Sequence, residues 1–392
     1  MSTIQKVQVD DNGTELAYID SGKPSGDTYT TLVCVHGHSY HAQNFSRLLA
    51  LAKKHNLRII ALNRRDYTGS TPFSQAELQV LKDGTDSEKH EFMRARGLEI
   101  AKFLVWVIKE LKIPRASEDG TAGGLALLGW SLGNITTIAF LGNLSSFPED
   151  IVQTLEPYLR TFIMYELPDN CFGYPRPEGY YHPFEDASIP ERIRGISFGK
   201  WVSSYYEHPA YKVESSSVEP STTTTTTTTT NTGSVFPPGN RTLDALQLRA
   251  PKKSARPCTL DKFTPNEILT CVDIAPGPRS EWPLWHLPSS LLQEQKRRAF
   301  LAGSEQIASD SEAGGNEKLR LPKLKIHVIC GLASLWVVQW ETWNLEEEYL
   351  KWASEGKERR PVKFVPVEGA NHFLHWDDSE QFLKLCSDGI KS

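Results

Sequence analysis

The chain has 392 residues, 39% hydrophobic and 23% charged, and a formal net charge of -5 with both signs scattered along the sequence. This composition allows a sizeable core and excludes a wholly disordered chain. It offers neither a basic stripe for nucleic acid nor a polybasic membrane surface, so we expect neither partner. The sequence also lacks an apolar run long enough to span a bilayer and the apolar segment of a secretory signal. We therefore expect a cytoplasmic protein without a membrane span.

The six cysteines indicate reduced core residues and not disulfides or metal ligands. None belongs to a C-x-x-C pair, and Cys34 and Cys330 lie inside apolar, strand-like runs. The sequence contains neither a phosphate-binding loop nor a zinc-ligand spacing. We therefore expect no metal and no organic cofactor.

The first part of the chain alternates strand-like and helix-like segments. Strand patterns cover 6–9, 15–19, 31–35 and 57–62. Helical spacing of apolar residues covers 42–54 and 91–111. The turn at 10–13 predicts a hairpin between the first two strands, and the continuous apolar runs of the later strands are typical of a sheet buried on both faces.

The central feature is an apolar run from Leu125 that stops at residues 129–133, Gly-Trp-Ser-Leu-Gly, directly before a helix-like segment over 135–141. A serine on such a sharp strand-to-helix turn is held clear of both elements, and glycines beside it avoid clashes with the neighbouring strand and helix. The free N–H groups at the start of the helix lie where an oxyanion would form. This context makes Ser131 the candidate nucleophile.

After a further strand-like run at 161–165 the alternation breaks at Leu167, and it resumes only near residue 320. Helical patterns within the interruption cover 192–206, 264–272 and 289–302. The threonine-rich stretch 215–239 predicts a disordered loop, and 303–318 has the composition of a second flexible segment. Strand patterns return at 325–330 and 362–367, with helical spacing at 341–355 between them. We therefore expect an α/β fold with a mostly parallel sheet, built from 1–166 and 320–392, and a largely helical cap inserted over 167–319.

A serine hydroxyl needs a base within hydrogen-bond reach to become a nucleophile near pH 7. His372 follows the last predicted strand directly, so its imidazole can reach the same sheet edge as Ser131. His375, three residues later, is the alternative, although a helix would turn it away. We favour His372 as the general base.

Three motifs resemble those of the α/β-hydrolases. They are His36-Gly37 after one strand, the Gly-Trp-Ser-Leu-Gly motif at 129–133, and Gly-Ala-Asn-His-Phe at 369–373. Their order along the chain is similar to that of the family and they cover residues 1–165 and 320–392, with the cap as the family's variable insertion. Segments 165–168 and 201–205 resemble fungal hydrolases of secondary metabolism.

The resemblance implies an oxyanion hole formed by the backbone N–H groups of Leu132 and His38. It leaves open whether the side chains of His38 and His41 line the pocket or are ordinary loop residues. The segment 64–66, Arg-Arg-Asp, occupies the place of a family turn motif and is expected to be structural.

The acid of the expected triad is not at its most common place in the family, because residues 331–336 hold no carboxylate. Some family members carry it after the strand that follows the nucleophile's helix, where this chain has Glu166. A carboxylate is needed to orient the imidazole and stabilise its charged form. We choose Glu166, with Asp169 and Glu341 as alternatives.

These residues together predict an esterase-like serine hydrolase that acts on a small-molecule carboxylic ester or related acyl compound through an acyl-enzyme. The fold alone does not choose among ester, thioester, lactone and C–C bond cleavage. A non-catalytic ligand-binding or interaction protein on the same fold is the alternative, because the acid is missing from its usual place. The oligomeric state and the cap's movements are open.

Overall fold

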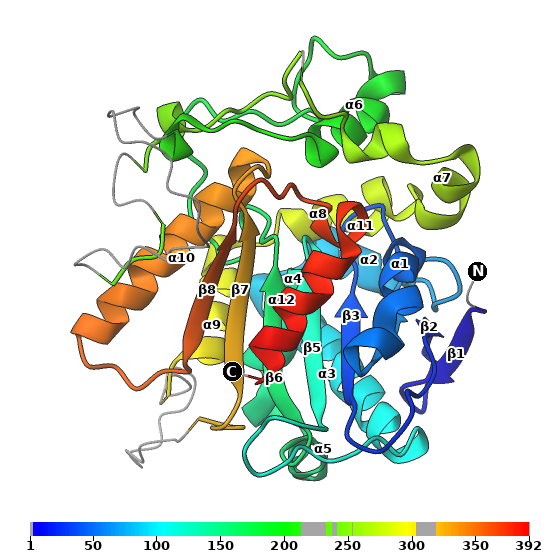
Figure 1. Cartoon of the computed structure of the whole chain (residues 1–392). Coiled ribbons are helices and arrows are strands. Elements are labelled where there is room, and N and C mark those ends of the chain that lie inside the picture. Colours follow the sequence, from blue (N-terminus) through cyan, green and yellow to red (C-terminus); the bar gives the residue numbers. More distant parts are fainter. Residues whose placement is uncertain (1–2, 213–232, 237–240, 253, 303–318, 392) are drawn as a thin grey trace.

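The computed structural model describes residues 3–212, 233–236, 241–252, 254–302 and 319–391. Within this part of the chain one eight-stranded sheet runs through the molecule in the order β1-β2-β4-β3-β5-β6-β7-β8 (Figure 1). Its strands are β1 (Gln5–Gln8), β2 (Glu15–Asp20), β3 (Thr30–Val35), β4 (Leu57–Leu62), β5 (Leu125–Trp130), β6 (Leu159–Tyr165), β7 (Lys325–Gly331) and β8 (Val362–Val367).

Only the first two strands are antiparallel to their neighbours; every pairing from β4 through β3, β5, β6 and β7 to β8 is parallel. Every residue of β3, β4, β5 and β6 is buried, as expected for strands covered by helices on both faces. The pairing of Trp130 with Tyr165 brings the carboxyl ends of β5 and β6 to one edge of the sheet. The predicted α/β class and mostly parallel sheet are confirmed.

Helices cover both faces of the sheet. They are α1 (Ser46–Leu51), α2 (Gln75–Asp83), α3 (Asp86–Glu110), α4 (Gly133–Gly142), α5 (Glu149–Leu155), α6 (Glu191–Ser203), α7 (Pro265–Cys271), α8 (Trp282–Trp285), α9 (Ser289–Phe300), α10 (Trp336–Ser354), α11 (Leu374–Asp377) and α12 (Ser379–Lys391). Helices α1 and α12 pack together on one face, while α3, α4 and α9 pack together on the other (Figure 1).

The longest helix, α3, shows why these segments are helical. Thr85 accepts a hydrogen bond from the N–H of Glu88, and the Glu88 carboxylate accepts one from the N–H of Thr85, which satisfies two donors at the helix start. Phe103, Leu104 and Val107 then recur at helical spacing and are buried beneath it. The pattern over 91–111 therefore predicted the helix but not its first turn, which is polar.

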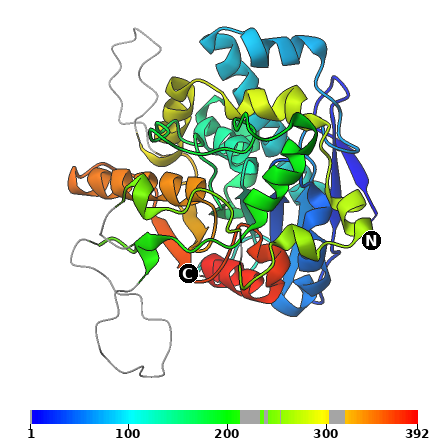
Figure 2. The same cartoon turned by 90° about the horizontal axis from the view of Figure 1, so that it is seen from above.

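Helices α6 and α7 lie over the carboxyl ends of the parallel strands, at the top of Figure 1 and on the side facing the viewer in Figure 2. Of the three helices expected there, α9 packs against α4 and so returns to the helical layer of the core. The division into a core of 1–166 and 320–392 and a cap of 167–319 stays a prediction. The predicted disordered loop 215–239 lies outside the described residues except for 233–236, and 303–318 lies outside them entirely.

None of the helices in the described ranges is long and apolar enough to cross a membrane. All six cysteines are free thiols; five are buried and Cys258 is half-buried. The predicted place in the core therefore holds for five of them and not for Cys258.

The turn around the serine tolerates no side chain at Gly133. A Cβ there would lie 2.4 Å from the carbonyl oxygen of His36 and 2.5 Å from that of Val35. We expect Gly133→Ala to lower the free energy of unfolding by about 1–3 kcal/mol, because backbone must move to admit the methyl group. Gly195, exposed on α6 with open space around it, is the matched control. Gly195→Ala should raise stability by about 0.5–1 kcal/mol in urea unfolding, and equal effects of the two changes would contradict this packing.

Candidate active site

Ser131 stands on a strained turn between β5 and α4. Its φ is +52°, in the left-handed region that L-residues avoid. Two hydrogen bonds hold this conformation: the Ser131 N–H donates to the carbonyl of Tyr165 at 3.0 Å, and Asn134 Nδ2 donates to the carbonyl of Ser131 at 2.9 Å. The strand, sharp turn and helix that the motif predicted are therefore present.

Glu166 and His372 form a buried pair at the same edge of the sheet. His372 Nδ1 lies 2.9 Å from Glu166 Oε2, and the two side chains are 3% and 0% exposed. The other carboxylate oxygen accepts the N–H of Gly331 at 2.6 Å, and Ser334 Oγ also donates to Oε2. Since the carboxylate accepts at Nδ1–H, the Nε2 atom of His372 is left as the acceptor that a serine hydroxyl needs.

The loop that carries His372 is fixed from below and from above. Trp130 Nε1 donates to the carbonyl of His372 at 3.1 Å, at the end of the nucleophile's strand. From above, Asn371 Nδ2 donates to the carbonyl of Ser203 at 2.9 Å and to Thr259 Oγ1 at 2.8 Å. Contacts with Ser203 and Thr259 therefore help to set the position of the imidazole.

Both ring nitrogens of His375, the alternative base, have other hydrogen-bond partners. Asn44 Nδ2 donates to its Nε2 at 2.9 Å, and its Nδ1 lies 3.3 Å from Tyr165 Oη. Its ring packs edge-on against Trp130, and burial holds its pKa well below the ordinary value. These contacts leave neither ring nitrogen for a serine.

The two alternative acids also have other partners. Asp169 accepts from Arg176 Nε at 2.5 Å and from Trp285 Nε1 at 3.1 Å. Glu341 accepts the N–H of Phe172 at 2.6 Å. Burial raises the pKa of both carboxyls. Among the three carboxylates, the structure brings Glu166 to His372.

The turn after β3 lies directly against the serine. A Cβ on Gly37 would come within 2.7 Å of Ser131 Cβ, so only glycine allows this approach. His36 Nδ1 donates to the carbonyl of Gly37 at 2.8 Å, while its Nε2 accepts the N–H of Arg64 at 3.1 Å. A neutral imidazole satisfies both bonds, and burial keeps the pKa of His36 well below its usual range.

An ion pair that the sequence did not reveal holds this turn from the other side. Arg64 donates to the carbonyls of His36 and Gly37, each at 3.0 Å. Its guanidinium also pairs with both carboxylate oxygens of Glu281, at 2.9 and 2.5 Å, with the side chains only 5% and 1% exposed. No local signal could have linked these residues, because 217 positions separate them. Arg64, within the segment 64–66 that was expected to be structural, thus supports the turn at His36 and Gly37.

A narrow cavity with a volume of about 20 Å³ lies between the serine and the segment above it. Its lining residues are His38, Ser131, Leu132, Pro168, Phe198, Trp201, Val202, Trp285, Leu335, Val337 and His372. No Asp, Glu, Lys or Arg is among them. Burial lowers the pKa of His38 to about 4, so this side chain is neutral at pH 7. The lining is therefore largely apolar.

The structure separates the two loop histidines whose role was open. His38 lines the cavity and packs edge-on against Phe198, with ring centroids 5.2 Å apart. His41 is not among the lining residues; its N–H donates to the carbonyl of Cys271 at 3.0 Å, below α7.

Another buried histidine, which sequence reasoning missed, lies among the aromatic residues of the cavity wall. The His182 ring centroid is 4.9 Å from that of Trp285 and 5.2 Å from that of Trp201. Its Nδ1 accepts the N–H of Phe184 at 3.2 Å, so the proton of the neutral ring is on Nε2. Within the described part of the chain Nε2 has no hydrogen-bond partner, and burial lowers the pKa of His182 to about 3.

This depressed pKa gives a stability prediction. Between about pH 6.5, where a histidine in the unfolded chain titrates, and pH 3, the unfolded state binds a proton that the folded state does not. Stability from this site is therefore lost as the pH falls through that window. In His182→Asn, whose Oδ1 can replace Nδ1 as acceptor, the loss is absent. The free energy of unfolding in urea, measured at pH 7, 5.5 and 4.5, should fall less in the variant than in the wild type at each step. A constant difference between the two proteins would contradict a neutral, desolvated His182.

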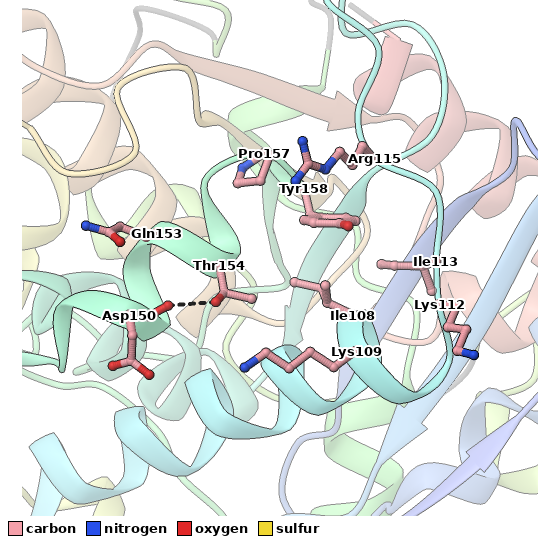
Figure 3. A pocket seen from close by; sticks show the side chains of 10 residues that line it. All are labelled: Ile108, Lys109, Lys112, Ile113, Arg115, Asp150, Gln153, Thr154, Pro157 and Tyr158. Carbon is pink, nitrogen blue, oxygen red and sulfur yellow. Dashed lines mark hydrogen bonds between the residues drawn. The ribbon is translucent and has the colours of Figure 1, made fainter.

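Neither a metal site nor a second hollow in the described ranges offers an alternative to this site. No group of three or more His, Cys, Asp or Glu residues that could hold a metal ion occurs in the described ranges. A more open hollow lies at the opposite end of the sheet, beside residues that precede β5 and β6 (Figure 3). Its lining residues include Lys109, Arg115 and Tyr158, and the only hydrogen bond drawn among them joins Thr154 to the carbonyl of Asp150. Ligands of parallel sheets bind at the carboxyl ends of the strands, which favours the Ser131 cavity.

Comparison with known proteins supports the fold. No family model and no curated protein matches the sequence. Among solved structures, a mutant N-acyl homoserine lactonase complexed with N-hexanoyl homoserine lactone is 12% identical, with 99% of this chain and 97% of that chain covered and a TM-score of 0.50. A Vigna radiata epoxide hydrolase mutant is 11% identical (100% and 98% covered, TM-score 0.48), and an esterase from Exiguobacterium antarcticum is 13% identical (100% of both covered, TM-score 0.45). The likeness to the lactonase structure, together with the strand order of the sheet, shows that the chain has the α/β-hydrolase fold, as its motifs implied.

Proposed function

We propose that the protein is a serine hydrolase that cleaves a small, uncharged carboxylic ester or related acyl compound through an acyl-enzyme. The observation that carries this proposal is the buried Glu166–His372 pair beside Ser131 at one cavity. A buried carboxylate bonded to Nδ1 fixes both the tautomer and the orientation that a general base requires.

In the proposed reaction Ser131 Oγ attacks the substrate carbonyl while His372 Nε2 takes its proton. The charge that forms on the imidazole is stabilised by Glu166. The backbone N–H groups of Leu132 and His38 bind the oxyanion, a contribution of about 3 kcal/mol or more for each donor. His372 then delivers the proton to the leaving group, and water activated by the same residue hydrolyses the acyl-enzyme.

The cavity restricts the substrate more than the fold does. Its walls are aromatic and aliphatic, and charged side chains are absent from the lining. Burying a carboxylate there without a partner would cost several kcal/mol, so an uncharged acyl group is favoured. Ester, lactone, thioester and C–C substrates share a tetrahedral intermediate at a carbonyl carbon and fit the same machinery. A role in fungal secondary metabolism rests on the sequence resemblance of 165–168 and 201–205 alone.

The triad is tested with a fluorophosphonate probe and short p-nitrophenyl esters. Ser131→Ala should lose labelling and turnover, because the nucleophile is gone. Glu166→Gln should keep the fold and lower kcat by about 10⁴-fold, because the imidazolium loses its stabilising charge.

Asp169→Asn is the matched control, since it removes a neighbouring buried carboxylate that pairs with Arg176. It should retain kcat within about tenfold of the wild type. Full activity in Glu166→Gln would remove this residue as the acid. Absence of labelling and of turnover in the wild type would favour a ligand-binding protein on the same fold.

The uncharged cavity gives a specificity prediction. Neutral aromatic acyl esters should be hydrolysed with a kcat/KM at least about 100-fold above that of matched esters that carry a free carboxylate, the factor expected from roughly 3 kcal/mol of uncompensated desolvation. The comparison uses p-nitrophenyl phenylacetate and the p-nitrophenyl monoester of a dicarboxylic acid of similar size. Equal values for the two esters would contradict the assignment of this cavity as the acyl site.

A further inference from the structure

Ser334 occupies a position between the proposed triad acid and the segment that covers it. Its hydroxyl donates to Glu166 Oε2, the oxygen that also accepts from His372 Nδ1. Its own N–H donates to the carbonyl of Gly331 at 3.1 Å, which forms a tight turn directly after β7. The side chain is fully buried. Ser334 is therefore placed to fix one lone pair of the carboxylate oxygen that orients the base.

The same turn is bound from above by a histidine of the inserted segment. His208 Nε2 lies 2.6 Å from the carbonyl oxygen of Ser334, and its Nδ1 accepts the N–H of Gln247 at 3.0 Å. A carbonyl can only accept, so the Nε2–H tautomer is fixed. Burial lowers the pKa of His208 to about 4, which keeps the ring neutral at pH 7. A second bond, from the N–H of Tyr206 to the carbonyl of Ala333 at 2.9 Å, joins the same two segments.

We propose that Ser334 is a positioning residue for Glu166, and that His208 couples the docking of the inserted segment to this carboxylate through the Ser334 turn. The inference rests on the proposed function, because it concerns the acid of the proposed triad. The turn also leads directly into Leu335 and Val337, which line the cavity. Docking of residues 206–208 thus sets both the acid and one wall of the substrate site.

The physical effect of the Ser334 hydroxyl can be derived from the contacts. With it, Glu166 accepts three hydrogen bonds, from Gly331, Ser334 and His372. Without it, Oε2 has one donor fewer, so its negative charge acts more strongly on the imidazolium, and the carboxylate is less restrained in rotation. Because the imidazole is then oriented less firmly, we expect a lower kcat, together with an upward move of the acidic limb of the rate profile.

Other titratable groups near the pair do not interfere with this readout. His375 and His38 stay neutral because burial lowers their pKa values, that of His38 to about 4. Burial raises the pKa values of Tyr165 and Cys330 well above the ordinary ones. Between pH 5 and 8 these four groups therefore do not contribute to the acidic limb of the rate profile.

The test compares Ser334→Ala with Ser334→Thr, which keeps the hydroxyl, and follows kcat/KM from pH 5 to 8. Ser334→Ala should lower kcat about 5- to 50-fold with little change in KM, and should move the acidic limb upward by about half a pH unit. Ser334→Thr should restore the position of the limb. An unshifted limb in Ser334→Ala, or the same loss in both variants, would mean that Ser334 serves only the packing of the turn.

The His208 link has its own pair of variants. His208→Gln places an amide donor where Nε2 now donates, whereas His208→Phe keeps the ring shape without a donor. We expect His208→Phe to reproduce the kcat loss and the limb shift of Ser334→Ala, and the double variant with Ser334→Ala to be little worse than either single change. His208→Gln should remain close to the wild type. Additive losses, or equal losses in both His208 variants, would overturn the coupling.

A measurement that needs no substrate turnover tests this inference independently of the proposed function. The Nδ1–H proton of His372 should give a strongly downfield proton NMR resonance, assigned by its loss in His372→Ala. It should move in Ser334→Ala and in His208→Phe but not in Ser334→Thr. If the resonance moves in this way while the wild type hydrolyses no ester, the positioning network stands and the proposed activity fails. If esters are hydrolysed and the resonance stays in place in all variants, the positioning role fails alone.

Discussion

The hydrogen bond between His372 Nδ1 and Glu166 Oε2 is the contact on which the rest of the site depends. A carboxylate with no access to solvent is stable only when its lone pairs are used, and here Gly331, Ser334 and His372 use them. Parallel strands make this possible, since β6 and β7 end side by side and bring residue 166 against the turn at 331–334. The orientation of the His372 ring, the proposed base, is thus fixed by these contacts.

Residues between Glu166 and β7 contribute polar contacts to the proposed site. Glu281 pairs with Arg64, which holds the carbonyls of the turn beside Ser131. Asn371, next to the base, bonds to Ser203 and Thr259 of the same segment. His208 reaches the acid through Ser334. Buried polar contacts with residues above the sheet therefore support the turn beside Ser131, the loop of His372 and the turn against Glu166, so the geometry of the proposed site depends on these contacts.

Much of the fold and the centre of the site could be predicted from sequence, because their signals are local. The buried strands β3 to β6, the glycines around Ser131 and the histidine after β8 each follow from a short pattern. Ser334, His208 and Glu281 could not be found in this way, since their partners lie 217 positions away for Glu281 and 126 for His208. Helix α9 resembled the other helices of the insertion in sequence, and only its packing on α4 shows that it joins the core layer.

The most direct measurement of the central claim is a crystal structure of the protein after reaction with a fluorophosphonate. We expect phosphorus bonded to Ser131 Oγ, with a phosphonyl oxygen within hydrogen-bond distance of the N–H groups of Leu132 and His38. His372 should remain on Glu166 through Nδ1 while its Nε2 faces the adduct. An adduct on another residue, or a His372 ring that leaves Glu166 for Asp169, would contradict the account.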